Sequence, residues 1–159
     1  MSGSCRLGLW FVHVWWSGDR VHRVIFSKTG IPGDVPRAFR RYCSGIEEHF
    51  SVLTSISASD PSVYGSVYRA VSEIPYGSVV TYGEIGERVG TSPRVVGQAM
   101  RRNPTPIIVP CHRVVAKKGM GGFSPSPEIK VILLDLERKA VNRRRKHVTD
   151  GNIHRENGP

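Results

Sequence analysis

The sequence predicts an α+β fold, with a small β-hairpin and helix at the N-terminus followed by a mainly helical C-terminal part. Two runs rich in aromatic and β-branched residues, 7–16 and 21–27, flank a turn at 17–20 and predict the hairpin. Apolar residues at helical spacing begin after residue 62 and predict the helices. A small, polar stretch at 55–62 lies between the two patterns. We therefore expect an N-terminal domain over 1–60, a second domain over 61–139 and a basic, disordered tail over 140–159.

Composition limits the class of protein. Hydrophobic residues make up 39% and charged residues 23% of the 159, as in soluble globular proteins. No apolar run is long enough to cross a membrane, and the first residues lack the pattern of a secretory signal. The three cysteines, at 5, 43 and 111, are an odd and widely spaced set, which argues against a disulfide framework. We expect a monomer in a reducing compartment, the cytoplasm or, in a eukaryote, the nucleus.

The charge is strongly positive and unevenly distributed. The formal net charge is +10, which favours a polyanionic partner. Seven Lys or Arg and no acidic residue lie between Arg88 and Pro127, around the central cysteine. The sequence therefore predicts an electropositive setting for Cys111.

Three helices are predicted outside the central region. Residues 36–54 favour a helix, although Gly45 weakens that prediction. The next helix begins near Val63 and ends before Pro75. A last helix opens at Pro127, and Glu137 falls at the edge of its apolar stripe. The apolar positions that define these three helices are Phe39, Tyr42 and Ile46; Val63, Val67, Ala70, Val71 and Ile74; and Ile129, Ile132, Leu133 and Leu136.

Between these helices the sequence predicts a helix-turn-helix. Thr81 and Glu84 form a capping box, and Gly90 has the position of a C-terminal cap. Ser92 and Pro93 then open a second helix that runs to Asn103. We expect Val95, Val96, Ala99 and Met100 to face inward, and Arg94, Gln98, Arg101 and Arg102 to face outward. Gly97 in mid-helix suggests the close approach of another backbone.

The chemistry is concentrated in residues 103–115, which read Asn-Pro-Thr-Pro-Ile-Ile-Val-Pro-Cys-His-Arg-Val-Val. Each proline fixes its own φ and favours extended backbone before it. We therefore expect a stiff, buried, extended segment that holds Cys111 in one place. Cysteine reacts as the thiolate, and a neighbouring base such as His112 promotes that form.

Several linked motifs resemble the O6-alkylguanine–DNA alkyltransferase family. The hallmark Pro-Cys-His-Arg occurs at 110–113, followed by Val-Val and preceded by a family-like stretch at 97–104. Ile74-Pro75-Tyr76-Gly77 and Thr81-Tyr82-Gly83-Glu84 also match, so the resemblance extends from about 63 to about 139. It implies an RNase H-like N-terminal domain and single-turnover transfer of an alkyl group from guanine O6 to Cys111. The implied partner is double-stranded DNA, bound in the minor groove with the damaged nucleotide flipped out, and no cofactor is implied.

The resemblance also implies roles for individual residues. A proton path would run from Cys111 through a water to His112, which Glu137 orients. Tyr82 would hydrogen-bond the purine, and Arg94 would replace the extruded nucleotide in the stack. The remaining implied positions are Asn103, which braces the site, and Val114, Phe123 and Ser124 around the guanine pocket.

Three other classes remain open on the residues alone. A cysteine hydrolase or acyltransferase would use Cys111 and His112, but it needs an oxyanion hole and usually a distant histidine. A non-catalytic protein that binds alkylated lesions would share the DNA-binding helices. A structural zinc site would need Cys5, Cys43, His13 and His22, whose spacing does not match known zinc motifs, so we expect none.

Overall fold

The N-terminal part is a mixed sheet. The computed structural model describes residues 1–46 and 49–153. Strands β1 (Ser2–Leu7), β2 (Trp10–Ser17) and β3 (Arg20–Ser27) pair antiparallel in that order, and β4 (Thr54–Ser55) pairs parallel with the start of β3. The predicted hairpin is confirmed as β2 and β3. Strand β1 was not predicted, because its small and polar residues carry no strand pattern and gain their order from pairing with β2.

Helix α1 (Arg37–Cys43) packs against this sheet, and the two share one apolar core. Phe39 and Tyr42 are fully buried, as their spacing predicted. The helix ends before Gly45, which has a φ of +78°. Ile46 therefore lies outside the helix and is exposed. Positions 47–48 of the predicted helical range lie outside the described residues.

The small, polar stretch at 55–62 between the two sequence patterns is structured. It contains the end of β4 and the 3-10 turn η1 (Ile56–Ser59). Ser55 and Ser57 are buried, and their hydroxyl groups bond to each other at 2.7 Å. Ser55 Oγ also lies 2.5 Å from Thr105 Oγ1. The buried hydroxyl groups satisfy one another, so this polar stretch is held against the segment that leads to Cys111.

The helical part contains α2 (Val63–Ser72), α3 (Tyr82–Val89) and α4 (Pro93–Arg101). The predicted caps are confirmed: Thr81 and Glu84 form a capping box, Gly90 is left-handed, and Ser92 caps α4. Helix α4 ends at Arg101, two residues earlier than expected. Two short strands, β5 (Val80–Thr81) and β6 (Val114–Val115), pair parallel and join α3 to the cysteine segment. The predicted α+β fold and helix-turn-helix are confirmed.

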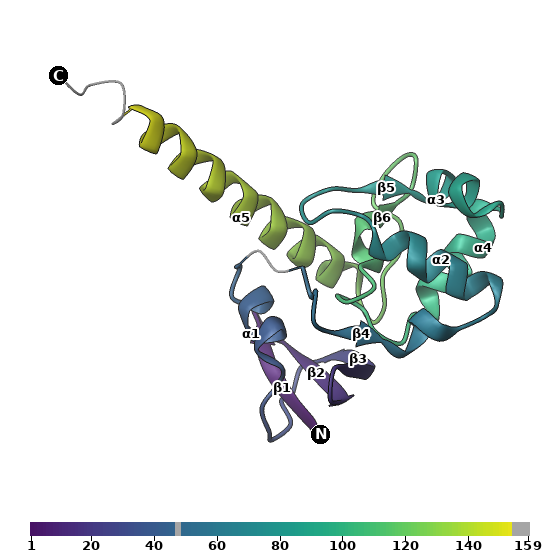
Figure 1. The fold of residues 1–159 in the computed structure, drawn as a ribbon, viewed down its shortest axis with the longest axis horizontal. Helices are drawn as coiled ribbons and strands as arrows, with labels where there is room; N and C mark the ends of the chain where they lie inside the picture. The colour runs from purple at the N-terminus through teal and green to yellow at the C-terminus, as the bar shows by residue number, and fades with distance from the viewer. Residues whose placement is uncertain (47–48, 154–159) are drawn as a thin grey trace.

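The last helix, α5 (Pro127–Ile153), is longer than predicted and projects from the body (Figure 1). Ile129, Leu133 and Ala140 are buried in the same core as the sheet and α1. Arg143 donates to the carbonyl of Gly45 at 3.0 Å. The expected disorder after residue 139 is therefore wrong for residues 140–153, which are helical. The helix continues because Ala140 packs in the core and because Arg and Lys have high helix propensity. Residues 154–159 lie outside the described part of the chain.

Two apolar cores result. One lies between the sheet, α1 and the first half of α5, and the other among α2, α3, α4 and the strands β5 and β6. Helix α5 thus follows the cysteine segment in sequence but packs on the N-terminal sheet. Over residues 1–46 and 49–153 no helix combines the length and apolar character needed to cross a bilayer.

Candidate active site

The segment before Cys111 is buried as predicted, but it is not extended. Ile107 has a φ of +77°, a strained value for a β-branched residue. The amide of Val109 donates to the Thr105 carbonyl at 3.0 Å. Asn103 holds this turn from both ends: its Oδ1 accepts from the Thr105 amide at 3.0 Å, and its Nδ2 donates to the Val109 carbonyl at 2.8 Å. Hydrogen bonds within this turn therefore override the extended preference that the prolines impose.

Cys111 opens a 3-10 turn, η2 (Cys111–Arg113), at the wall of a cavity of about 880 Å³. The thiol residue is only 7% exposed. The cavity lies between the helix-turn-helix, strand β3 and the loop before α5. Six of the predicted site residues border it together with the cysteine: Tyr82, Arg94, Arg101, Asn103, Phe123 and Ser124. A concave site of this size suits a small organic group.

Three of the predicted DNA- and guanine-binding residues lie away from this cavity. Gln98 accepts a hydrogen bond from the Tyr64 hydroxyl at 3.3 Å, and the Arg102 guanidinium lies 5.5 Å from the centre of the Tyr64 ring. Val114 is buried, and its carbonyl accepts from Lys130 Nζ at 2.6 Å. Gln98 on α4 and Arg102 just after it thus contact Tyr64, while Arg94 and Arg101 border the cavity.

Two glycines have roles that the sequence did not assign. A Cβ on Gly97 would meet no atom within 4 Å, so the predicted close approach of another backbone at Gly97 is wrong. Gly97 borders the cavity instead. The close approach occurs at Gly86, where a Cβ would lie 2.7 Å from the Thr91 carbonyl oxygen in the turn of the helix-turn-helix. Gly97 therefore leaves open space at its own position on the cavity wall.

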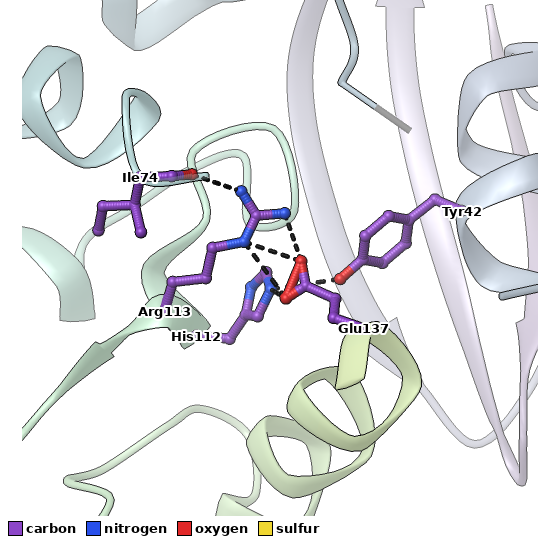
Figure 2. A network of polar contacts seen from close by, with 5 residues as sticks. All are labelled: Tyr42, Ile74, His112, Arg113 and Glu137. Atoms are coloured by element: carbon purple, nitrogen blue, oxygen red, sulfur yellow. Dashed lines mark hydrogen bonds and ion pairs between the residues drawn. The ribbon is translucent and has the colours of Figure 1, made fainter. Parts of the chain in front are cut away.

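Behind Cys111 lies a buried polar network, shown in Figure 2. His112 Nε2 lies 3.0 Å from Glu137 Oε2 and 3.2 Å from the Tyr42 hydroxyl. Arg113 Nε donates to Glu137 Oε1 at 2.8 Å, and Arg113 Nη2 also contacts Oε1. Arg113 Nη1 donates to the Ile74 carbonyl at 2.8 Å. His112, Glu137 and Tyr42 are fully buried, so the network is isolated from bulk water.

The burial of these groups sets their protonation. Burial raises the pKa of Cys111 to about 11, although the Asn103 side chain and the Lys130 charge oppose the shift. Burial also lowers the pKa of His112, against the attraction of Glu137. Burial alone would raise the pKa of Glu137, but hydrogen bonds and charge from His112 and Arg113 outweigh it, and that pKa is lowered. At neutral pH the site therefore holds a thiol, a neutral imidazole and a carboxylate.

The tautomer of His112 follows from the same contacts. The ionised Glu137 can only accept, so the ring proton lies on Nε2. Among the described residues none hydrogen-bonds to Nδ1, although this nitrogen is buried. His112 thus presents an unprotonated Nδ1 that can accept a proton.

Two charged residues of the site were missed from the sequence. Lys130 is 1% exposed; its Nζ lies 5.7 Å from the centre of the Tyr82 ring, and its charge favours the thiolate of Cys111. Arg113 forms the buried ion pair with Glu137. Helical spacing carried a signal for Lys130, because positions 130, 133 and 137 lie on one face of α5. The partner of Glu137 lies 24 residues away, so only the fold identifies it.

The N-terminal cysteines and histidines do not form a metal-binding cluster. Cys5 and Cys43 lie close, with their Sγ atoms 3.6 Å apart. His13 Nε2 instead contacts the Thr29 carbonyl at 2.6 Å, and His22 Nε2 contacts Ser17 Oγ at 2.8 Å. No group of three or more potential metal ligands occurs within the part of the chain that the structure describes.

Comparison with known proteins gives matches over both halves of the chain. The profile of the DNA-binding domain of 6-O-methylguanine DNA methyltransferase matches residues 62–139. Methylated-DNA–protein-cysteine methyltransferases of Thermococcus barophilus and Metallosphaera sedula are both 54% identical, over 72 and 71 residues. Each match covers 45% of this chain, but only 41% and 46% of the relative. The matched chain thus spans less than half the length of these curated relatives.

Solved structures extend the similarity to the N-terminal sheet. The O6-methylguanine-DNA methyltransferase of Pyrococcus kodakaraensis is 30% identical with a TM-score of 0.68, over 86% of this chain and 97% of that one. A Mycobacterium tuberculosis OGT solved in complex with DNA is 26% identical with a TM-score of 0.72, over 86% and 92%. Because the similarity to the Pyrococcus protein includes nearly all of its length, the chain belongs to the O6-methylguanine-DNA methyltransferase family.

Proposed function

We propose that this protein repairs alkylated DNA by moving the alkyl group from O6 of guanine to Sγ of Cys111. The observation that supports this most strongly is the position of Cys111, which lines a cavity beside a helix-turn-helix and precedes the buried His112–Glu137 pair. A cysteine hydrolase would not require the helix-turn-helix. The names of the curated relatives agree with a transfer to cysteine.

His112 serves as the base in this proposal. Because the pKa of Cys111 is about 11, the thiol must lose its proton during the reaction at neutral pH. A water between Sγ and His112 Nδ1 passes this proton to the imidazole. Glu137, held by Arg113, stabilises the imidazolium that forms, since its carboxylate accepts the hydrogen bond from Nε2.

The transfer is a direct displacement. Sγ forms a bond to the alkyl carbon while the carbon–oxygen bond breaks, and the electron pair of that bond leaves on the guanine. Tyr82, which borders the cavity, donates a hydrogen bond to the departing base, which then takes up one proton in place of the one lost by the thiol. The product is a thioether at Cys111, and no residue in the described part of the chain offers a route back to the thiol. Each molecule therefore acts once.

Access to the base requires that the nucleotide leave the duplex. Helix α4 enters the minor groove, and Arg94 at its first turn takes the place of the extruded nucleotide. Arg101 lies on the same cavity and faces the DNA, while Phe123 and Ser124 border the flipped guanine. Since repair must act at any sequence, affinity comes mainly from phosphate contacts and falls as salt increases.

Intact mass after reaction with a duplex that carries one O6-methylguanine tests the function. We expect a gain of one methyl group per protein molecule, with no further gain in excess DNA. The variant Cys111→Ser should bind the lesion and gain no mass, and a duplex with unmodified guanine is the control. If the wild type binds the lesion tightly and gains no mass, the protein is a non-catalytic lesion binder and the proposal is wrong.

A further inference from the structure

A residue of the N-terminal domain reaches the polar network behind Cys111. Tyr42 comes from α1, which belongs to the sheet side of the molecule, and its hydroxyl lies 3.2 Å from His112 Nε2. Figure 2 shows its ring on the opposite side of Glu137 from Arg113. The ring packs between Phe50 and Tyr76, with centroid distances of 5.7 and 6.0 Å. This packing fixes the position of the hydroxyl group.

The protons in this contact can be assigned. Burial, followed by the negative charge of Glu137, raises the pKa of Tyr42 well above its ordinary value, so the phenol stays neutral. The proton on His112 Nε2 points to Glu137 Oε2 at 3.0 Å and lies close to the Tyr42 oxygen. A phenol oxygen can accept a share of this hydrogen bond. With the proton fixed on Nε2 by Glu137, the Tyr42 oxygen is a second acceptor for it.

We propose that Tyr42 is a positioning residue for alkyl transfer, which together with Glu137 keeps the His112 proton on Nε2 and leaves Nδ1 to receive the thiol proton. The inference rests on the proposed function and goes beyond it, because it makes the N-terminal domain a part of the reacting centre. Its effect acts through His112, since Tyr42 does not border the cavity. When the imidazole takes up the thiol proton, the Tyr42 oxygen stabilises the imidazolium alongside the carboxylate.

Other groups around the histidine bear on its titration. The titratable and charged groups that face His112 or Tyr42 from the surrounding elements are Glu137 and Lys130 on α5, Arg113 and Cys111 on η2, Cys43 on α1, and Tyr76. The cations Arg113 and Lys130 lower the pKa of His112, and Glu137 raises it. Loss of the Tyr42 oxygen leaves these charges unchanged, so its effect can be separated from theirs.

The variant Tyr42→Phe in the full chain removes the oxygen and keeps the ring. The rate of a single methyl transfer should rise with pH as His112 becomes neutral. In Tyr42→Phe the imidazolium loses one partner, so we expect this rise to occur at lower pH and the maximal rate to fall about 2- to 10-fold. Tyr68→Phe is the matched control, because its buried hydroxyl bonds the Ala99 carbonyl at 3.0 Å outside this network. That variant should keep the pH dependence of the wild type.

Nitrogen NMR of His112 in the wild type gives a second test that does not depend on the variant. The inference predicts the tautomer with the proton on Nε2, and observation of the other tautomer would overturn it. A wild-type pH profile in folded Tyr42→Phe would also overturn it, while the proposed function would stand. Absence of any methyl transfer by the wild type would instead contradict the proposed function itself.

Discussion

The buried pair of Glu137 and Arg113 should make a large contribution to stability, and Glu137→Gln tests it. The substitution keeps the size of the side chain but leaves the Arg113 charge unpaired in a site where Glu137 is fully buried. Breaking such a pair costs about 3–5 kcal/mol. Arg113 keeps its bond to the Ile74 carbonyl, and a glutamine oxygen still accepts one hydrogen bond. We therefore expect a loss near the lower end, about 3 kcal/mol, from a total of about 5–15 kcal/mol.

Asp135→Asn is a matched control two residues away on the same helix. It removes the same charge from an ion pair with Arg138, but Arg138 and Asp135 are 67% and 46% exposed. An exposed pair contributes about 0–1 kcal/mol. Urea unfolding of both variants and the wild type at neutral pH measures the difference. Equal losses for the two variants would refute the importance given to burial.

The pH dependence of this difference has a defined sign. The pKa of Glu137 is lowered from its ordinary value of 4.5 in the folded protein. The stabilisation is therefore fully present above the unfolded pKa and is lost as pH falls through the lower, folded pKa. The advantage of the wild type over Glu137→Gln should stay constant from about pH 7 to about pH 5 and shrink in more acidic solution. An advantage that grows on acidification would contradict the assignment of Glu137 as a buried carboxylate.

Three further predictions concern the cavity and the charge near Cys111. Gly121→Ala places a Cβ 2.8 Å from the Tyr82 hydroxyl oxygen at a φ of +75°, so it should slow methyl transfer and destabilise the protein by about 1–2 kcal/mol. Gly122→Ala is the control and should do neither, because no atom lies within 4 Å of its Cβ. Equal effects of the two variants on activity and thermal unfolding would refute this prediction. Gly97→Ala should stabilise helix α4 by up to about 1 kcal/mol, because its Cβ meets no other atom. The bulkier Gly97→Leu should weaken binding to DNA, since Gly97 borders the cavity. Unchanged DNA affinity of the leucine variant would show that Gly97 does not face the DNA. Lys130→Met should raise the pKa of the Cys111 thiol further, because the Lys130 charge favours the thiolate. The reaction of Cys111 with iodoacetamide at alkaline pH should then be slower than in the wild type. An unchanged reaction rate would contradict this prediction.

Local signals were sufficient for the helix-turn-helix. Thr81 and Glu84 bond each other across three residues, and the left-handed Gly90 and the cap Ser92 act within a single turn. Such contacts need no distant partner, so the sequence contains all the information that specifies them. The apolar stripe on α5 was also predictable, because helical spacing is a local pattern, but Glu137, expected at its edge, is fully buried.

Long-range contacts account for what the sequence did not predict. The turn that contains the left-handed Ile107 is closed by local hydrogen bonds, but its contact with the distant Ser55, through Thr105, depends on the fold. Strand β1 has no pattern of its own, and its order comes from β2. The approach of Tyr42 to His112 spans 70 residues and depends on how α1 packs against α5. No spacing rule along the chain contains that information.

Peptide mapping after reaction with a limiting amount of O6-methylguanine duplex tests the central claim most directly. The chain has three cysteines: Cys5 on β1 and Cys43 on α1 lie close together, and of the three only Cys111 borders the cavity. The proposed mechanism predicts that all transferred methyl is found on the peptide that contains Cys111 and that the amount equals the lesion consumed. Methyl groups on Cys5 or Cys43, or repair of the lesion without any methylated cysteine, would contradict it.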